Sequence, residues 1–476
     1  MKRELILVIL PWLLLAGCMV GPKYVKPTVP LPQPDAFKEY KKLDGWKTAQ
    51  PNDQAIRGNW WEIFADPELN SLEQQVAASN QDLKAAEARF REARAMIRFN
   101  RSYEFPTISA GASIASVRDS SNRPYFPASY NTGDFVLPFD LSYEVDLWGR
   151  IRRQVTSARE ETQATAADLE TVKLSLQAEL AFDYFELRSA DAQKQLLDDT
   201  VQAYTEALQL TVNRLEGGYS PKSDVAQART QLDTTRVQDT DVAVLRAAYE
   251  HAIAVLIGKP PAQFTLEPTH STFQPPDIPV GLPSMLLERR PDIAAVERRV
   301  AEANEQIGIA RAAFFPSLVL SATGGVEGTS IVNWFNWPSR FWAVGPSMVQ
   351  TIFDAGRRRA TSEATQASYD AMVASYRQAT LSAFQQVEDN LAALRVLSHE
   401  AEQQREATAS AQESLELFTN RYTGGLDPYL QVITAQTIAL GNERNDVDIL
   451  RRRMDASVLL VKALGGGWNV SQLPKL

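Results

Sequence analysis

The chain has 476 residues, of which 44% are hydrophobic, so it is long enough to bury a sizeable core. Its 58 acidic residues outnumber its 49 basic residues, and the net charge of −9 disfavours binding to nucleic acid through phosphate neutralisation. With three histidines and one cysteine, a metal site built from imidazole or thiolate ligands is close to excluded.

The first twenty residues, MKRELILVILPWLLLAGCMV, combine basic residues, a short apolar run and small residues before Cys18. The apolar run is too short to cross a bilayer, so it indicates a secretory signal rather than a membrane span. The stretch LAGC resembles a lipobox, so residues 1–17 are expected to be a cleaved lipoprotein signal peptide and Cys18 to carry a covalent lipid, with no other cofactor. Met19, in place of Asp, favours the outer membrane. The alternative is an ordinary signal peptide with an incidental cysteine.

Residues 18–65 are rich in proline and charge, and we expect a mostly extended, lipid-anchored N-terminal segment. A helical pattern follows from Asp66 to about Asn100, with Pro67 where a first turn accepts proline.

Two halves of the chain repeat the same short sequences. TVNRLEGGYSPKSDVAQART at 211–230 matches FTNRYTGGLDPYLQVITAQT at 418–437, at an offset of 207. FPTISAGAS at 105–113 matches FPSLVLSAT at 315–323, at an offset of 210. The sequence therefore predicts two structural repeats, at residues 66–260 and 285–465. A proline-rich linker at 261–284 joins them, and a C-terminal segment follows at 466–476.

Very long helices are expected in both repeats. Residues 150–216 and 357–423 contain no glycine or proline, and each stretch would be roughly 100 Å long if fully helical. After each Gly-Gly pair a second helix returns, over about 221–257 and 428–464, because the glycines allow a left-handed cap and the following proline opens a helix. The repeated sequences are thus predicted to be the tips of two helical hairpins. A coiled-coil-like seam is expected at Phe384, Val387, Leu391, Leu394 and Ser398.

Four strands are predicted, at about 105–116, 134–147, 315–323 and 341–353. Their apolar and polar residues alternate, as in strands between lipid and an aqueous lumen, and the last strand is expected to place Ile352 on its apolar face. Loops 116–134 and 324–340 would face outward. Four strands cannot close a barrel, and open edges are not tolerated in lipid, so the pattern predicts a homo-oligomer, most simply a twelve-stranded trimer. The alternative is a soluble sandwich packed on a helix pair.

Together, the lipobox, the repeated unit, the Phe-Pro at each first strand, the Arg-x-x-Gly-Gly tips and the terminal ALGGGW at 463–468 resemble the TolC-type outer-membrane efflux family, whose members are outer membrane factors. More narrowly, the chain is similar to the lipid-anchored branch that works with RND-type multidrug pumps. The resemblance covers about residues 18–470.

This resemblance implies an α+β membrane protein, in which a trimeric twelve-stranded outer-membrane β-barrel continues into a long periplasmic α-helical barrel with a mixed equatorial belt. It also implies a passive conduit in the Gram-negative cell envelope, with a periplasmic adaptor and an inner-membrane pump as partners. The family's helix tips dock the adaptor, and the matching residues here are Arg214, Gly217, Gly218, Arg421, Gly424 and Gly425.

The family's periplasmic gate commonly reads Y-L-x-x-L-D-A-Q-R, and this chain has YLQVITAQT at 429–437. Leu430 is kept, but Thr434 and Thr437 stand where the family has Asp and Arg, so the resemblance implies a neutral constriction here. Asp224 and Asp427, near the two tips, could supply charge instead, or could be helix-start caps.

Other functions remain as alternatives. An exit duct for a type I protein exporter has the same architecture, and a non-conducting coiled-coil spacer lipoprotein would explain the helices but not the strands. The sequence contains no HExxH motif, P-loop, nucleophile elbow or EF-hand spacing, so an enzyme is not expected. The exported substrate is not predicted.

Overall fold

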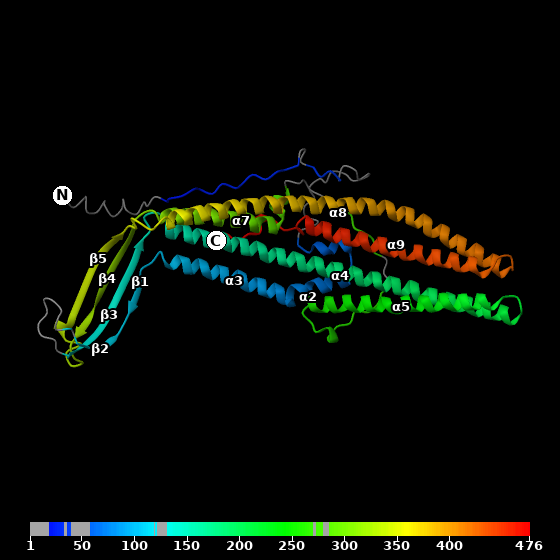
Figure 1. Ribbon diagram of the computed structural model, residues 1–476, viewed down its shortest axis with the longest axis horizontal. Helices are drawn as coiled ribbons and strands as arrows, with labels where there is room; N and C mark the ends of the chain where they lie inside the picture. Colours follow the sequence, from blue (N-terminus) through cyan, green and yellow to red (C-terminus); the bar gives the residue numbers. More distant parts are fainter. Residues whose placement is uncertain are drawn as a thin grey trace.

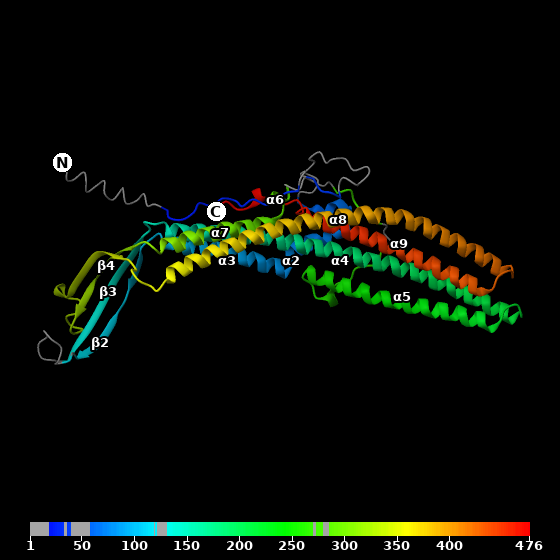
Figure 2. The same cartoon turned by 45° about the horizontal axis from the view of Figure 1, so that its top comes forward.

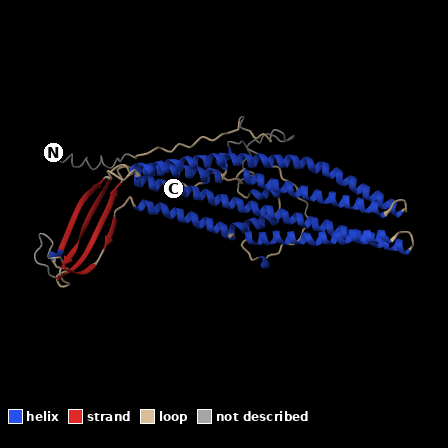
Figure 3. Cartoon of the chain, in the orientation of Figure 1, coloured by secondary structure: helices blue, strands red, loops and turns tan. Residues whose placement is uncertain are grey.

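The structure is a computed structural model. The predicted signal peptide, Cys18 and parts of the predicted linker and of loop 116–134 lie outside the residues it describes. Those residues form an elongated molecule, with a sheet at one end, helices running away from it and two hairpin tips at the far end (Figures 1 and 3). The described residues are 19–32, 36–39, 58–118, 120, 131–269, 273–278 and 285–476.

The helices follow the order of the two repeats. The first repeat contains α2 (Pro67–Ser79), α3 (Gln81–Ser102), α4 (Arg150–Glu216) and α5 (Lys222–Leu256). The second contains α6 (Leu286–Arg289), α7 (Pro291–Ala312), α8 (Arg357–Thr423) and α9 (Tyr429–Ala463). Short 3₁₀ turns lie at Trp60–Phe64, Pro261–Gln263, Trp337–Ser339 and Val470–Gln472.

The single helix predicted over 66–100 is divided at Asn80. This residue has an extended backbone (φ −60°, ψ 132°), and its side-chain oxygen accepts from the Leu83 N–H at 3.0 Å, which caps α3. Its side-chain amide donates to the Leu256 carbonyl at 2.8 Å, so the break also ties α2 and α3 to the end of α5.

The two long helices, α4 and α8, occupy the same residues as the two stretches that lack glycine and proline, and each has 67 residues. The predicted seam of α8 is largely found, because Val387 and Leu391 are fully buried. Its predicted end at Ser398 is wrong: Ser398 is exposed and Leu397 is buried instead. An α-helix has 3.6 residues per turn, so a strict seven-residue repeat drifts around a straight helix and the contact stripe moves to the preceding position.

The sheet has the order β1-β3-β4-β5, and all described pairs are antiparallel. β2 also pairs with β3, so β1 and β2 are two parts of one interrupted strand and the chain fills four strand positions. The interruption at residues 111–112 lies opposite Pro138, which has no N–H to donate. The strands are β1 (Thr107–Ala110), β2 (Ser113–Arg118), β3 (Asn131–Val145), β4 (Ser317–Gly328) and β5 (Arg340–Val349).

Two strand boundaries differ from the prediction by four residues or more. β4 extends to Gly328, so the loop that precedes β5 is shorter than predicted. β5 ends at Val349, and Ile352 lies beyond it with 93% of its surface exposed, so its assignment to the strand face is wrong. The strand ends at Val349 because its partner there, Ser317, is the first residue of β4 and follows Pro316, which has no N–H to donate. Asp354 then begins the turn into α8: its carboxylate accepts from the Gly356 N–H at 3.1 Å and from the Arg358 N–H at 3.2 Å.

The strand register gives the sheet one apolar and one polar face. Residues paired across neighbouring strands share a face. Ile108, Leu141, Ala322 and Val344 form one such row, and the next row is Ser109, Asp140, Thr323 and Ala343.

The main hydrophobic core lies in the middle of the helical part rather than near the sheet. Among its fully buried residues are Leu187 of α4, Leu391 of α8 and Val458 of α9. Within the described residues, no helix is both long and apolar enough to cross a lipid bilayer.

Candidate gate and docking surface at the hairpin tips

Both hairpins end in the same backbone cap. Gly218 and Gly425 have φ angles of +74° and +76°, in the left-handed region that glycine tolerates best. The next residue then donates its N–H back into the helix, from Tyr219 to the Arg214 carbonyl at 2.8 Å and from Leu426 to the Arg421 carbonyl at 2.9 Å. These bonds satisfy carbonyls that a helix end would otherwise leave unpaired. The predicted Gly-Gly tips therefore have a direct geometric cause.

The first tip is bonded to the second. The Arg214 guanidinium donates to the Thr423 carbonyl at 3.0 Å and lies 4.7 Å from the centre of the Tyr422 ring. The hydroxyls of Ser220 and Tyr422 are 3.3 Å apart, and the Ser220 hydroxyl donates to Asp224 at 2.6 Å. Hydrogen bonds and a cation–π contact thus join the two hairpins of one chain at their ends.

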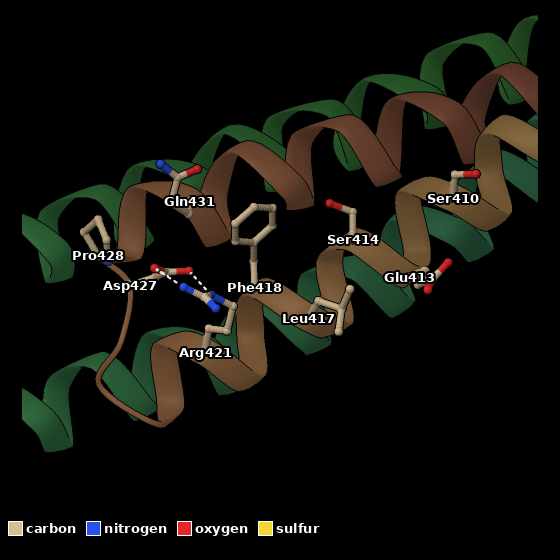
Figure 4. Close-up of a pocket in the computed structure, with 9 residues that line it drawn as sticks. All are labelled: Ser410, Glu413, Ser414, Leu417, Phe418, Arg421, Asp427, Pro428 and Gln431. Atoms are coloured by element: carbon tan, nitrogen blue, oxygen red, sulfur yellow. Dashed lines mark hydrogen bonds and ion pairs between the residues drawn. The ribbon is translucent and has the colours of Figure 1, made fainter.

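The second tip holds its own ion pair. The Arg421 guanidinium donates two hydrogen bonds to the Asp427 carboxylate, at 2.6 and 3.1 Å, and this bonding lowers the pKa of Asp427 below its usual range. The pair lies in a cavity of about 670 Å³ between α8 and α9. Figure 4 shows the lining residues, which are Ser410, Glu413, Ser414, Leu417, Phe418, Arg421, Asp427, Pro428 and Gln431.

The predicted gate residues of α9 share one face. Leu430, Thr434 and Thr437 are spaced by four and three residues, and all three are exposed. The Thr434 hydroxyl donates to the Leu430 carbonyl at 2.9 Å, and the Thr437 hydroxyl donates to its own helix at the same distance. Their hydroxyl protons are therefore used within α9, and the Thr437 oxygen also accepts from the Gln231 side-chain amide of α5 at 3.3 Å. The stripe presents the Thr434 oxygen, methyl groups and one leucine side chain.

The structure does not bring the two predicted aspartates into this stripe. Asp427 is bound to Arg421 in the cavity between α8 and α9, and Asp224 is half-buried beside Ser220. The N-cap positions of α5 and α9 are Pro221 and Pro428, so neither aspartate is the N-cap residue. Asp224 nevertheless lies in the first turn of α5, where the helix dipole favours a negative charge.

Sequence reasoning missed two aromatic residues at the tips. Tyr422 and Tyr429 are buried with ring centres 5.0 Å apart, and burial raises the pKa of Tyr429 to about 12. The available signal was a departure from the repeat: Tyr422 stands where the first repeat has Leu215, and Tyr429 stands where it has Lys222. The positions at which the two otherwise repeated tips differ in sequence are therefore those at which the contacts of the two hairpins differ.

Comparison with known proteins gives consistent matches. The family model described as outer membrane efflux protein matches residues 72–259 and 282–466. The toluene efflux pump outer membrane protein TtgF of Pseudomonas putida is 32% identical, over 97% of this chain and 96% of that protein. The cation efflux system protein CusC of Escherichia coli is 29% identical, over 96% of this chain and 97% of that protein. Among solved structures, the outer-membrane channel OprN superposes with a TM-score of 0.86 and 29% identity, over 95% of this chain and 100% of that one.

Proposed function

Because the chain belongs to the outer membrane efflux protein family, we propose that three copies of it form a passive conduit from an inner-membrane pump and its periplasmic adaptor to the cell exterior. The resemblance inferred from the sequence is confirmed, and so is the architecture of a barrel sheet continued by long helices. The protein is an efflux component of the outer membrane. We propose that it has no catalytic activity of its own.

The open sheet is the observation that carries this proposal. One edge consists of β1 and β2 and the other of β5, and apolar side chains near both edges are largely exposed. Ile108 is 70% exposed on the first edge and Trp342 is 80% exposed on the other. Such edges are not stable in a bilayer unless another strand covers them. Three copies with four strand positions each would close a twelve-stranded barrel, an even number in the range of outer-membrane barrels.

The test of the conduit is pore activity in a planar bilayer. The purified oligomer is expected to give discrete conductance steps, and its bands on a gel should be modified by heat. A chain that reaches the outer membrane but conducts nothing would favour the coiled-coil spacer. Efflux of small molecules that is lost on deletion, with protein secretion unchanged, would exclude the type I exporter duct.

We further propose that Leu430, Thr434 and Thr437 line a neutral periplasmic constriction. Thr434→Asp would place three carboxylates in such a ring and is expected to raise cation selectivity in single-channel recordings. Asp427→Asn serves as the comparison, because its carboxylate is already paired with Arg421, and it should leave selectivity unchanged. A shift in selectivity with Asp224→Asn or Asp427→Asn, and none with Thr434→Asp, would move the constriction to the aspartates.

The adaptor is proposed to dock on the six similar tips that three chains present. Gly217, Gly218, Gly424 and Gly425 shape the tips, and Leu426 is 71% exposed at the end of the second one. A photo-cross-linking residue at position 426, irradiated in living cells, is expected to capture a periplasmic adaptor. The same residue at position 139, on the outer face of the sheet, is the control and should not capture it.

The lipid on Cys18 and the identity of the pump are also proposals. Intact mass of the mature chain is expected to show cleavage before Cys18 and an added acyl mass. The relatives are named for toluene and for cation efflux, and we propose a small-molecule pump of the RND type for this chain. The chain contains few methionines, histidines and cysteines, so a substrate metal would pass through the tunnel without specific ligands from this protein.

A further inference from the structure

A buried arginine near the sheet binds the main chain of the N-terminal segment. Arg153, in the first turn of α4, donates from Nε to the Val20 carbonyl at 2.7 Å and from Nη2 to the Pro22 carbonyl at 3.1 Å. Its Nη1 donates to Glu305 of α7 at 2.7 Å. The side chains of Arg153 and Glu305 are only 2% and 8% exposed. We call residues 19–32 the N-terminal strap, and the group formed by Arg153 and Glu305 the strap socket.

The strap completes the hydrogen bonding of this buried pair. A guanidinium has five N–H donors and no acceptor, and a buried charge is costly unless its hydrogen bonds are made. Without the strap, Arg153 would keep the bond to Glu305 and lose the two carbonyl acceptors of Val20 and Pro22. The socket is therefore matched to a main chain that presents two carbonyls from residues two positions apart.

The backbone of the strap contacts the backbone of α7 so closely that the strap must have a glycine at position 21. Gly21 lies between the two bound carbonyls and has a φ angle of +113°, which L side chains rarely adopt. A Cβ at Gly21 would lie 2.6 Å from the Cα of Gly308 in α7, so a side chain there would collide with the helix backbone. Only glycine on the strap allows the carbonyls to reach Arg153.

The socket lies beside the junction of the sheet and the helices. The Val20 N–H donates to the carbonyl of Trp148, between β3 and α4, at 3.0 Å. The Trp148 ring stacks on Phe315 at 4.6 Å and donates to the Pro316 carbonyl, immediately before β4. Figures 1 and 2 show the strap, in dark blue, running from this junction along the helices. Met19, the first described residue, follows Cys18 directly in the sequence.

We propose that the strap socket is the docking site of the mature N-terminus and that Arg153 positions the lipid-bearing end at the foot of the sheet. Arg153 belongs to the first repeat and Glu305 to the second, so the anchor is joined to both halves of the chain. This inference deepens the proposed lipid anchor and rests on it for its biological meaning. The docking itself depends only on the contacts of residues 20–22.

Hydrogen exchange measured by mass spectrometry on the purified full-length protein tests the docking. Gly21→Ala changes the strap alone, and Arg153→Met removes the donors from the socket. Both variants are expected to raise the exchange rate of the peptide that contains residues 19–32 by at least about tenfold. Arg150→Met is the matched control, because Arg150 lies one turn away and pairs with Glu144 instead of the strap.

A second contact shows whether the effect is local. Glu388 accepts from the N–H groups of Lys38 and Glu39 at 2.6 and 2.9 Å, far along the segment from the socket. Exchange at these two residues is expected to stay unchanged in Gly21→Ala. Unchanged exchange of residues 19–32 in Gly21→Ala would overturn the proposal, even if Arg153→Met fails to fold.

The position of the lipid is tested separately. The chain has one native cysteine, so a spin label on Lys23→Cys reports from a single place once Cys18 is acylated. Residue 23 is exposed, so the test is the difference: the label is expected to be more mobile in Gly21→Ala than in the parent protein, while intact mass shows the same acylation in both. Equal mobility of the label in the acylated parent and in acylated Gly21→Ala would overturn the proposed positioning. Absence of the acyl mass, with slow exchange of residues 19–32, would overturn the lipid anchor and leave the docking intact.

Discussion

The middle of the helical part and the hairpin tips are built from the same long helices but are held in different ways. In the middle, α4, α8 and α9 share one large core that contains Leu187, Leu391 and Val458. At the tips the buried apolar cluster is small, and it centres on Tyr422 and Tyr429. Regions with few buried apolar contacts open at lower free-energy cost than the core. The chain therefore combines a stable middle with ends that can separate.

The ion pairs of the middle and of the tips also differ, in how far their side chains are buried. In the middle, the side chain of Arg188 is fully buried and bonds Asp191 at 2.9 Å, and Arg246 bonds the same carboxylate at 2.7 Å. At the second tip, the Arg421 side chain is 54% exposed while it pairs with Asp427. Buried pairs are strongly destabilising to break, whereas exposed pairs contribute little and are screened by salt. The contacts of the proposed gate at the tips can thus change without disturbing the middle.

The largest expected effect comes from the core. Leu391→Ala leaves a cavity at a fully buried position and should lower the free energy of unfolding by about 2–5 kcal/mol. Val396→Ala, at a position that is 51% exposed on the same helix, is the control and should change it by under about 1 kcal/mol. Thermal unfolding of the purified protein measures both. Equal losses in the two variants would contradict the placement of the core.

A buried carboxyl in the middle should make stability depend on pH. Burial, together with nearby Glu186, raises the pKa of Asp455 to about 7, and the pKa of Asp183 is raised to about 7 mainly by burial. The folded chain then binds more protons than the unfolded chain between about pH 4 and pH 7, so stability falls as the pH rises through this range. Asp455→Asn should remove roughly 1–3 kcal/mol of this fall. Unfolding midpoints at pH 5 and pH 8 measure it, and the same fall in parent and variant would contradict the assignment.

A smaller effect is expected when the two hairpins are separated. Tyr422→Ala removes the ring contact with Tyr429, the cation–π contact with Arg214 and the hydroxyl partner of Ser220, which together are worth roughly 1–2.5 kcal/mol. Local hydrogen exchange at the tips should rise while the core stays protected, and single-channel conductance should increase. Tyr219→Ala, at a residue that is 80% exposed, is the control. Faster exchange in the core would show that the regions are not independent.

The smallest expected effect tests the shared backbone cap. Gly218→Ala and Gly425→Ala place a side chain in the left-handed region and should each cost about 1 kcal/mol, by similar amounts because the two caps are alike. Gly441→Ala lies within α9 with open space around its Cβ position, and it should stabilise the helix by about 0.5–1 kcal/mol. Local hydrogen exchange is therefore expected to become faster in Gly218→Ala and Gly425→Ala and slower in Gly441→Ala. A stabilising Gly218→Ala would contradict the cap.

Much of this architecture could be predicted from particular features of the sequence. The 67-residue helices follow from the absence of glycine and proline between Gly149 and Gly217, and the hairpins follow from the repeated Gly-Gly pairs. The break at Asn80 was not predicted, because an asparagine inside a helical pattern is compatible with a helix until a distant carbonyl, that of Leu256, binds its side chain. The end of β5 was misplaced because apolar alternation continues through Ile352, although β4 offers no partner residue beyond the pair of Ser317 and Val349.

The candidate gate divides in the same way. The sequence by itself determined which residues occupy the tips, and helical spacing put Leu430, Thr434 and Thr437 on one face. Only the tertiary structure decided that Asp427 pairs with Arg421 and that Tyr422 is shared between the two hairpins. The spacing of residues along a helix determines which face of the helix each side chain leaves from. The partner of a charge or a ring depends on a second helix, whose approach is set by the packing of residues far away in the chain.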